Sequence, residues 1–103
     1  MKLKYRPAAI ADIRNACGYI REKLQNPQAA KRLKTRLLHG ASLLKDNPYL
    51  GARLDSRYDG LDTDIRFLVV SRHLIFYEVN GDVIEVIRIL DGRTDYLTYL
   101  LDD

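Results

Sequence analysis

The period of the hydrophobic pattern changes in the middle of the chain, and this change constrains the fold more than any other feature. From Pro7 to Leu44, apolar residues recur every three or four positions, which is typical of amphipathic helices. From residue 65 onward, runs of β-branched and aromatic residues indicate strands. Because the two kinds of segment are separated along the chain, we expect an α+β fold with the helices on one face of a sheet.

The first half predicts an N-terminal strand followed by an antiparallel helical hairpin at about residues 8–46. The strand is the alternating segment Lys2–Arg6, which we expect to pair within the sheet. The apolar stripe of the first helix contains Ile10, Ile13, Cys17, Ile20 and Leu24. The stripe of the second contains Ala30, Leu33, Leu37, Ala41 and Leu44. Asn26 and Pro27 suit the cap and first position of the second helix, and so short a connection favours antiparallel packing.

The second half predicts a loop at about residues 47–64, a sheet at 65–91 and a tail at 94–103. The predicted strands are Ile65–Ser71, Leu74–Val79 and Val83–Leu90, so that with the first strand the sheet has four strands and is mainly antiparallel. Asn80-Gly81 supplies the positive φ angles of a type I′ hairpin turn. In the tail we expect a short C-terminal helix, capped by Thr94, with Leu97, Leu100 and Leu101 facing inward.

Composition excludes several classes of protein. The chain has 103 residues, of which 47% are apolar and 30% charged, as expected for a single folded domain spanning residues 1–103. It has no apolar run of about 20 residues for a membrane span, and its N-terminus lacks a signal-peptide pattern. Cys17 is the only cysteine, which excludes an internal disulfide, and we expect it to be a small buried residue. These features favour a cytoplasmic protein.

Charge is divided unevenly along the chain. Residues 1–45 contain eleven Lys and Arg against two Asp and Glu, a net charge of +9, whereas residues 46–103 contain six Arg against twelve acids, a net charge of −6. A basic helical half attracts an acidic partner or nucleic acid. The alternative interpretation is a solvated helix surface without a partner.

Motifs of known chemistry are missing from the sequence. No nucleophile elbow, zinc-protease helix, phosphate loop or dinucleotide motif is present. Asp55, Asp59 and Gly60 fit a calcium loop, but Arg57 and Arg66 occupy positions where oxygen ligands are required. We therefore expect neither a metal nor a cofactor. His39 on the second helix and His73 at a turn have no neighbouring ligand residues in the sequence.

Arginines on and beside the predicted sheet are the remaining candidates for chemistry. Arg88 interrupts an apolar strand, and it therefore needs solvent or an acidic partner such as Glu78. Arg93 follows Gly92 at the end of that strand, where a rigid sheet presents an exposed side chain. The structural alternative for Arg93 is a salt bridge to Asp91 or Asp95.

Two long segments carry a family resemblance. "PAAIADIRNACGYIREKLQNPQAA" and "RHLIFYEVNGDVIEVIRILDGRTDYLTYLL" resemble the RelE/ParE superfamily of toxins from bacterial type II toxin–antitoxin modules, in order, spacing and total length. The resemblance implies a helical hairpin over an antiparallel sheet and a role in growth inhibition and plasmid stabilisation. It also implies a cognate antitoxin, which typically wraps an acidic segment around the toxin and through which the toxin reaches operator DNA.

The superfamily has two main branches. RelE-like members cut messenger RNA in the ribosome, and their catalytic arginine and tyrosine correspond to Arg93 and Tyr99. A second arginine of that branch is replaced by Leu74 here, and no lysine follows Lys45. ParE-like members poison DNA gyrase and are not nucleases. The resemblance is therefore closer to the ParE-like branch, and Tyr99 has the alternative role of docking the tail on the sheet.

The resemblance leaves three functions open. The first is ParE-like poisoning of gyrase, the second is a ribosome-dependent mRNA endonuclease (an mRNA interferase), and the third is a non-toxic relative that only binds its antitoxin. Five further residues are predicted to contact the target or its phosphates, and these are Arg66, Arg72, His73, Arg88 and Tyr96.

Overall fold

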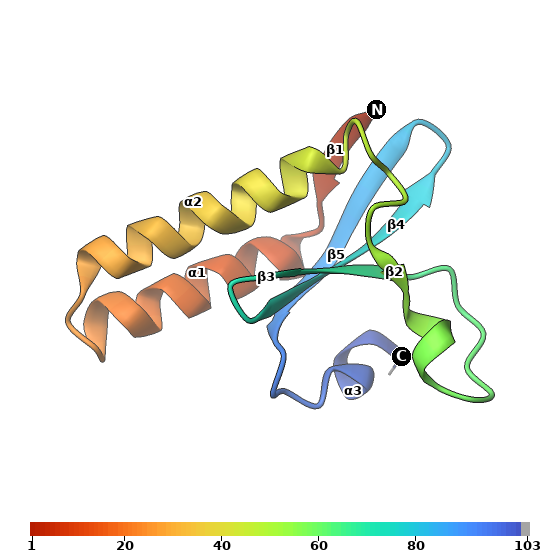
Figure 1. Ribbon diagram of the computed structural model, residues 1–103. Coiled ribbons are helices and arrows are strands. Elements are labelled where there is room, and N and C mark those ends of the chain that lie inside the picture. The colour runs from red at the N-terminus through yellow and green to blue at the C-terminus, as the bar shows by residue number, and fades with distance from the viewer. Residues whose placement is uncertain (102–103) are drawn as a thin grey trace.

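The computed structural model describes residues 1–101 as two helices packed on a sheet, with a third, short helix on the other side (Figure 1). The order of the elements is β1 (Lys2–Tyr5), α1 (Pro7–Glu22), α2 (Pro27–Leu43), β2 (Ala52–Arg53), a 3₁₀ turn η1 (Leu54–Arg57), β3 (Arg66–Val70), β4 (His73–Asn80), β5 (Val83–Asp91) and α3 (Tyr96–Leu101). This arrangement confirms the predicted α+β class. No helix among these residues is long and apolar enough to cross a membrane.

The sheet has five strands in the order β1-β5-β4-β3-β2. The pairs β2–β3, β3–β4 and β4–β5 are antiparallel. The edge strand β1 runs parallel to β5. The four predicted strands are all present. The prediction missed β2, whose two residues lie in the expected loop and pair with Phe67 and Arg66. A two-residue pairing has no periodicity, and the sequence therefore contained no pattern that could indicate it.

The helical hairpin forms as predicted, and its local sequence explains its limits. Pro7 occupies the first turn of α1 and Pro27 that of α2. The Asn26 side chain accepts a hydrogen bond from the Ala29 amide at 3.0 Å, as expected for a cap. Two members of the predicted first stripe are exposed instead. Leu24 lies beyond the end of α1, and Ile10 lies beside a groove described below.

One core lies between the hairpin and the sheet. Cys17 is buried there, as predicted, together with residues of both helices and of the strands β4 and β5. The buried members are Ala9, Ile13, Cys17, Ala30, Leu33, Leu37, Ala41, Ile75, Val86 and Ile89. Burial of this apolar face is the main reason why two helices of this length are stable on the sheet.

A second core lies on the opposite face of the sheet, beneath the 54–61 segment and α3. Its buried members are Leu54, Ile65, Phe67, Leu74, Phe76, Ile87 and Leu90. Leu97 and Leu100 pack against it, as predicted, but Leu101 is 44% exposed, because it is the last residue of a helix of only six residues. The residue directly before α3 is Asp95 rather than the predicted cap Thr94, and Thr98 Oγ1 donates a hydrogen bond to Asp95 Oδ2.

A β-bulge interrupts the pairing of β4 with β5. Phe76 lies opposite Arg88, whereas the next residue, Tyr77, lies opposite Val86, so that Ile87 has no opposite residue. A bulge changes the direction of the side chains that follow it. Because Phe76 belongs to the second core, Arg88 emerges on the same face as α3.

Candidate functional site

Several predicted contact residues meet at the end of the sheet where β3 and β5 end and β4 begins. We call Arg72, His73, Asp91, Gly92 and Arg93 the strand-end cluster. Arg72 belongs to the turn between β3 and β4, and His73 begins β4 opposite Asp91, the last residue of β5. The Gly92 amide donates a hydrogen bond of 3.0 Å to the Arg72 carbonyl, which joins the two turns. The sheet therefore brings together residues that are about twenty positions apart in the sequence.

The turn at Arg72 has a strained backbone. Ser71 and Arg72 have φ angles of 49° and 64°, in the left-handed region that residues other than glycine disfavour by about 1 kcal/mol or more each. The other hairpin turn is formed by Gly81 and Asp82, since Asn80 still pairs with Val83 at the end of β4. The predicted type I′ turn at Asn80-Gly81 was therefore wrong, because only Gly81 has a positive φ, of 61°. Strain at an exposed arginine turn is a feature that often accompanies a functional surface.

Arg93 is held in one orientation although it is almost fully exposed. Its Nε and Nη2 each lie 3.1 Å from Asp91, on Oδ1 and Oδ2, and its own backbone amide donates to Asp91 Oδ1 at 2.8 Å. The side chain is 93% exposed. These hydrogen bonds from Arg93 lower the pKa of Asp91 to about 2. Of the two acids proposed from the sequence, Asp91 is thus the partner of Arg93.

A groove of about 400 Å³ runs from the strand-end cluster along α1. Tyr19 and Leu24 line it from the helical hairpin, and both are more than half exposed. His73, Asp91 and Arg93 line it from the sheet. An exposed aromatic and an exposed leucine beside a positioned arginine are typical of a surface that binds a protein. We call this the Arg93 groove.

Arg88, a second predicted contact residue, is bound within the protein. Its Nε and Nη2 contact the two carboxylate oxygens of Asp12 at 2.8 Å, and Asp12 Oδ2 also accepts from the Ile89 amide at 2.9 Å. The expected partner Glu78 was wrong, since Glu78 and Glu85 pair with Arg6 instead. Hydrogen bonding to Asp12 raises the pKa of Arg88, and its side chain is only 21% exposed.

The two tyrosines of α3 hold the tail on the sheet. The Arg88 guanidinium lies 5.1 Å from the centre of the Tyr99 ring, a cation–π contact. The hydroxyl of Tyr96 lies 2.7 Å from the hydroxyl of Tyr58, and the ring of Tyr96 packs on Phe76. This hydrogen bond raises the pKa of Tyr58. Within residues 1–101, Tyr99 contacts Arg88 and forms no hydrogen bond with Arg93.

Arg66 lies at the opposite end of β3 from Arg72. Its Nη1 donates to the Gly51 carbonyl at 2.8 Å, and its guanidinium stacks over Tyr49. The Gly51 amide donates to the buried Tyr77 hydroxyl, also at 2.8 Å. Any Cβ at Gly51 would lie 2.6 Å from the Phe67 carbonyl, and this position therefore requires glycine. Arg66 thus anchors the loop after α2.

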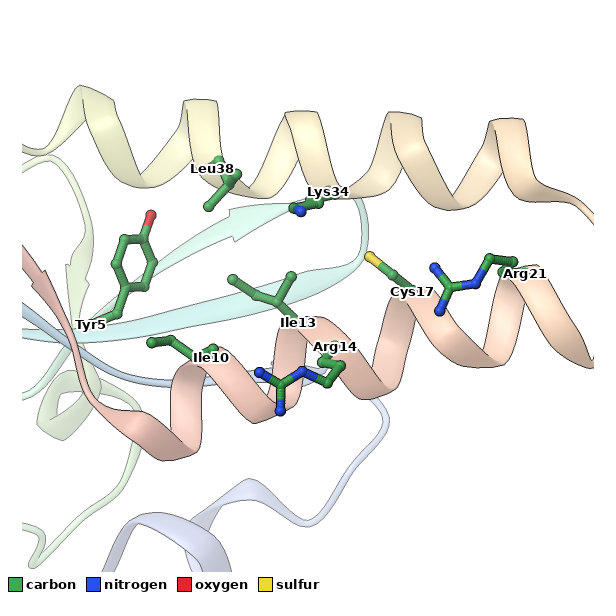
Figure 2. Close-up of a pocket in the computed structure, with 8 residues that line it drawn as sticks. All are labelled: Tyr5, Ile10, Ile13, Arg14, Cys17, Arg21, Lys34 and Leu38. Atoms are coloured by element: carbon green, nitrogen blue, oxygen red, sulfur yellow. The ribbon is translucent and has the colours of Figure 1, made fainter.

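A second groove, which the sequence did not predict, separates the two helices (Figure 2). It has a volume of about 300 Å³. Figure 2 shows Leu38 and Lys34 on α2 facing Ile13 and Cys17 on α1, with Tyr5 at one end. Burial raises the pKa of Tyr5. Three cations also line this space, and they are Arg14, Arg21 and Lys34. We call it the hairpin groove.

The sequence indicated the hairpin groove only indirectly. Ile10 continues the apolar stripe of α1, and periodicity alone assigned it to the core. The excess of basic residues in the first half was the only sign of a binding surface. Among residues 1–101, no three His, Cys, Asp or Glu side chains gather as ligands for a metal ion.

The layered α+β fold, with an arginine directly after its last long strand, agrees with the fold expected from the RelE/ParE resemblance. Residues 3–96 match the family model described as "ParE toxin of type II toxin-antitoxin system, parDE". The chain therefore belongs to the ParE toxin family, which confirms the resemblance seen in the sequence.

Comparison with solved structures supports the same fold. A chain described as "Chromosomal ParDE TA system from P. aeruginosa" superposes with a TM-score of 0.72 at 22% sequence identity, over 88% of this chain and 95% of that one. A search of curated proteins found no match.

Proposed function

We propose that this protein inhibits bacterial growth by binding and poisoning DNA gyrase, and that a cognate antitoxin neutralises it. The carrying observation is the Arg93 groove, in which exposed apolar side chains lie beside an arginine that Asp91 holds in place. Arginine and aromatic residues dominate the energetics of protein interfaces. A side chain that is already oriented loses less entropy when it binds, which favours contact with a macromolecular target.

The positions that correspond to catalytic residues of RelE-like toxins support a binding role. Leu74, which stands where RelE-like toxins have an arginine, is 9% exposed and packs in the second core. Tyr99, at the position of the catalytic tyrosine, is engaged by Arg88. Phosphoryl transfer relies on several positioned cations and a group that accepts a proton. Arg93, which corresponds to the catalytic arginine of the RelE-like branch, is exposed, and Asp91 offsets its charge.

The mRNA endonuclease is the second candidate, and one observation favours it. His73 Nδ1 lies 3.0 Å from the Ser71 carbonyl, which can only accept, and Nδ1 therefore carries the proton. The other ring nitrogen, Nε2, is then able to accept a proton, in the same groove as Arg93. This arrangement would let His73 act as a general base toward a ribose hydroxyl.

The hairpin groove is the proposed site for the antitoxin. Apolar side chains between two helices suit the apolar face of a third helix, and the surrounding cations suit an acidic segment. The antitoxin would thus bind away from Arg93, or cover both grooves with one extended chain. Contact with operator DNA would then depend on the antitoxin for its sequence specificity.

Controlled expression in bacteria separates these functions. Gyrase poisoning predicts growth arrest with DNA-damage signalling and intact transcripts, and arrest relieved by co-expression of the antitoxin. Codon-positioned cuts in translated messages would favour the endonuclease instead. Normal growth at high expression would favour the non-toxic relative and contradict the proposal.

A further inference from the structure

The outward face of α2 carries positive charge that nothing in the described structure balances. The 17 residues of the helix include Lys31, Arg32, Lys34 and Arg36 and no acidic residue. Within residues 1–101, none of these four side chains takes part in an ion pair. Five exposed side chains on this face line a shallow hollow and define the α2 basic face, and they are Gln28, Lys31, Arg32, Thr35 and Arg36.

This charge pattern works against the stability of the helix. Arg32 and Arg36 are four positions apart on one face, where like charges repel. The first turn of α2 has no acidic residue to offset the positive end of the helix dipole. A surface helix selected for stability alone would alternate acids with bases. The concentration of cations on α2 therefore indicates that this face binds an anionic partner.

We infer that the α2 basic face binds the phosphate backbone of double-stranded DNA. Each of its five side chains carries hydrogen-bond donors of the kinds that contact phosphate oxygens in protein–DNA complexes. The face contains no aliphatic or aromatic residue. A peptide helix would need apolar anchors there, and single-stranded nucleic acid would need aromatic side chains for stacking. The choice of DNA over double-stranded RNA rests on the proposed gyrase target.

The α2 basic face is separate from the hairpin groove. Lys34 and Leu38 line the hairpin groove, whereas the residues of the α2 basic face line a different hollow on the same helix. The antitoxin and DNA would thus use different sides of α2. The toxin would add a contact without sequence preference to DNA that gyrase or the antitoxin already holds.

Fluorescence anisotropy of the purified full-length toxin with a short labelled duplex of arbitrary sequence tests this inference without gyrase or antitoxin. If Lys31, Arg32 and Arg36 each neutralise one phosphate, affinity for the duplex falls about 40-fold as salt rises from about 50 to 200 mM. The reason is that the logarithm of the affinity falls against the logarithm of the salt concentration with a slope of about −0.9 per neutralised phosphate. The triple variant K31Q/R32Q/R36Q is expected to bind at least about tenfold more weakly at the lowest salt and to lose most of that slope.

A matched variant controls for net charge. K2Q/K4Q/K45Q removes the same charge from exposed positions in and near β1, and it is expected to bind DNA like the wild type. Thermal unfolding and antitoxin binding establish that both variants are folded. Equal weakening by the two triple variants would overturn the inference, as would absence of duplex binding at low salt or tighter binding of double-stranded RNA. Because the assay contains no gyrase, the measured affinity for duplex DNA does not depend on whether gyrase is the target of the toxin.

Discussion

Arg88 and Asp12 form a two-pronged ion pair, with both contacts at 2.8 Å, although 76 residues separate them in the sequence. Asp12 lies on α1, and Arg88 emerges from the bulge of β5 on the face covered by α3. Tyr99 stacks on the same guanidinium. One ion pair therefore connects the helical hairpin, strand β5 and the C-terminal helix, and it fixes the strand that precedes Arg93.

Asp12→Asn is expected to destabilise the fold by about 3 kcal/mol, because it leaves a largely buried Arg88 without a counterion and weakens the bond to the Ile89 amide. Urea denaturation measures the change in the free energy of unfolding. Glu85→Gln, which disrupts the more exposed pair with Arg6, serves as the control and should cost less than about 1 kcal/mol. Equal costs for the two variants would argue against a special role for the Asp12–Arg88 pair.

Arg93→Ala is expected to remove most growth inhibition while the protein stays folded, since the side chain is 93% exposed and its loss removes only the solvent-screened ion pair with Asp91. Loss of an interface arginine of this kind raises the concentration needed for gyrase inhibition by about 30-fold or more. Dose–response curves with purified protein measure the effect. Arg53→Ala is the matched control, since Arg53 likewise makes a two-pronged pair with an acid two positions away, Asp55, and it should retain full inhibition. Unchanged potency of Arg93→Ala would contradict the assigned contact.

Arg72→Gly is expected to stabilise the protein while weakening its toxicity. Glycine accepts the φ of 64° without strain, which should raise the free energy of unfolding by about 0.5–1 kcal/mol. The same change deletes an exposed guanidinium of the strand-end cluster. Ser71→Gly relieves similar strain and keeps Arg72, so that it should stabilise without loss of toxicity. Loss of toxicity in both variants would indicate that turn conformation matters rather than the arginine.

The ion pair between Asp91 and Arg93 makes a contribution to stability that depends on pH. The pKa of Asp91 is lowered from 3.8 to about 2 in the folded protein. Its stabilising effect is therefore complete above pH 4 and is lost as the pH falls from about 4 to 2. Titration of the Asp91 carboxyl by NMR should give a pKa of about 2 in the wild type. In Arg93→Ala the pKa should rise toward 3.8, and an identical pKa in both proteins would be inconsistent with the pair.

Local sequence was sufficient for most of the fold. Asn26-Pro27 located the start of α2, because a cap acts through the backbone of its immediate neighbours. Asn80-Gly81 indicated the hairpin between β4 and β5 but placed its turn one residue too early. The apolar stripes likewise indicated which helix faces meet the sheet. The bulge at Ile87 was not predictable, because it depends on the pairing of two strands rather than on the residues of one.

The site was predictable only in part. Arg93 stood out because a strand followed by Gly-Arg exposes a side chain whatever the rest of the chain does. The partner of Arg88 could not be found in the same way, since Asp12 lies on a distant helix and Glu78 was nearer in the sequence. The two grooves arise from the packing of α1 against α2 and against the sheet. Ile10, which periodicity assigned to the core, is exposed beside the hairpin groove, and Leu24 is exposed because α1 ends before it.

A supercoiling assay with purified gyrase and relaxed plasmid determines whether this toxin acts on gyrase through the Arg93 groove. Wild-type toxin is expected to block supercoiling and to trap gyrase on cleaved DNA, and prior addition of the antitoxin is expected to prevent both effects. Arg93→Ala is expected not to block supercoiling at matched concentrations. Unimpaired supercoiling at saturating wild-type toxin would contradict this action on gyrase.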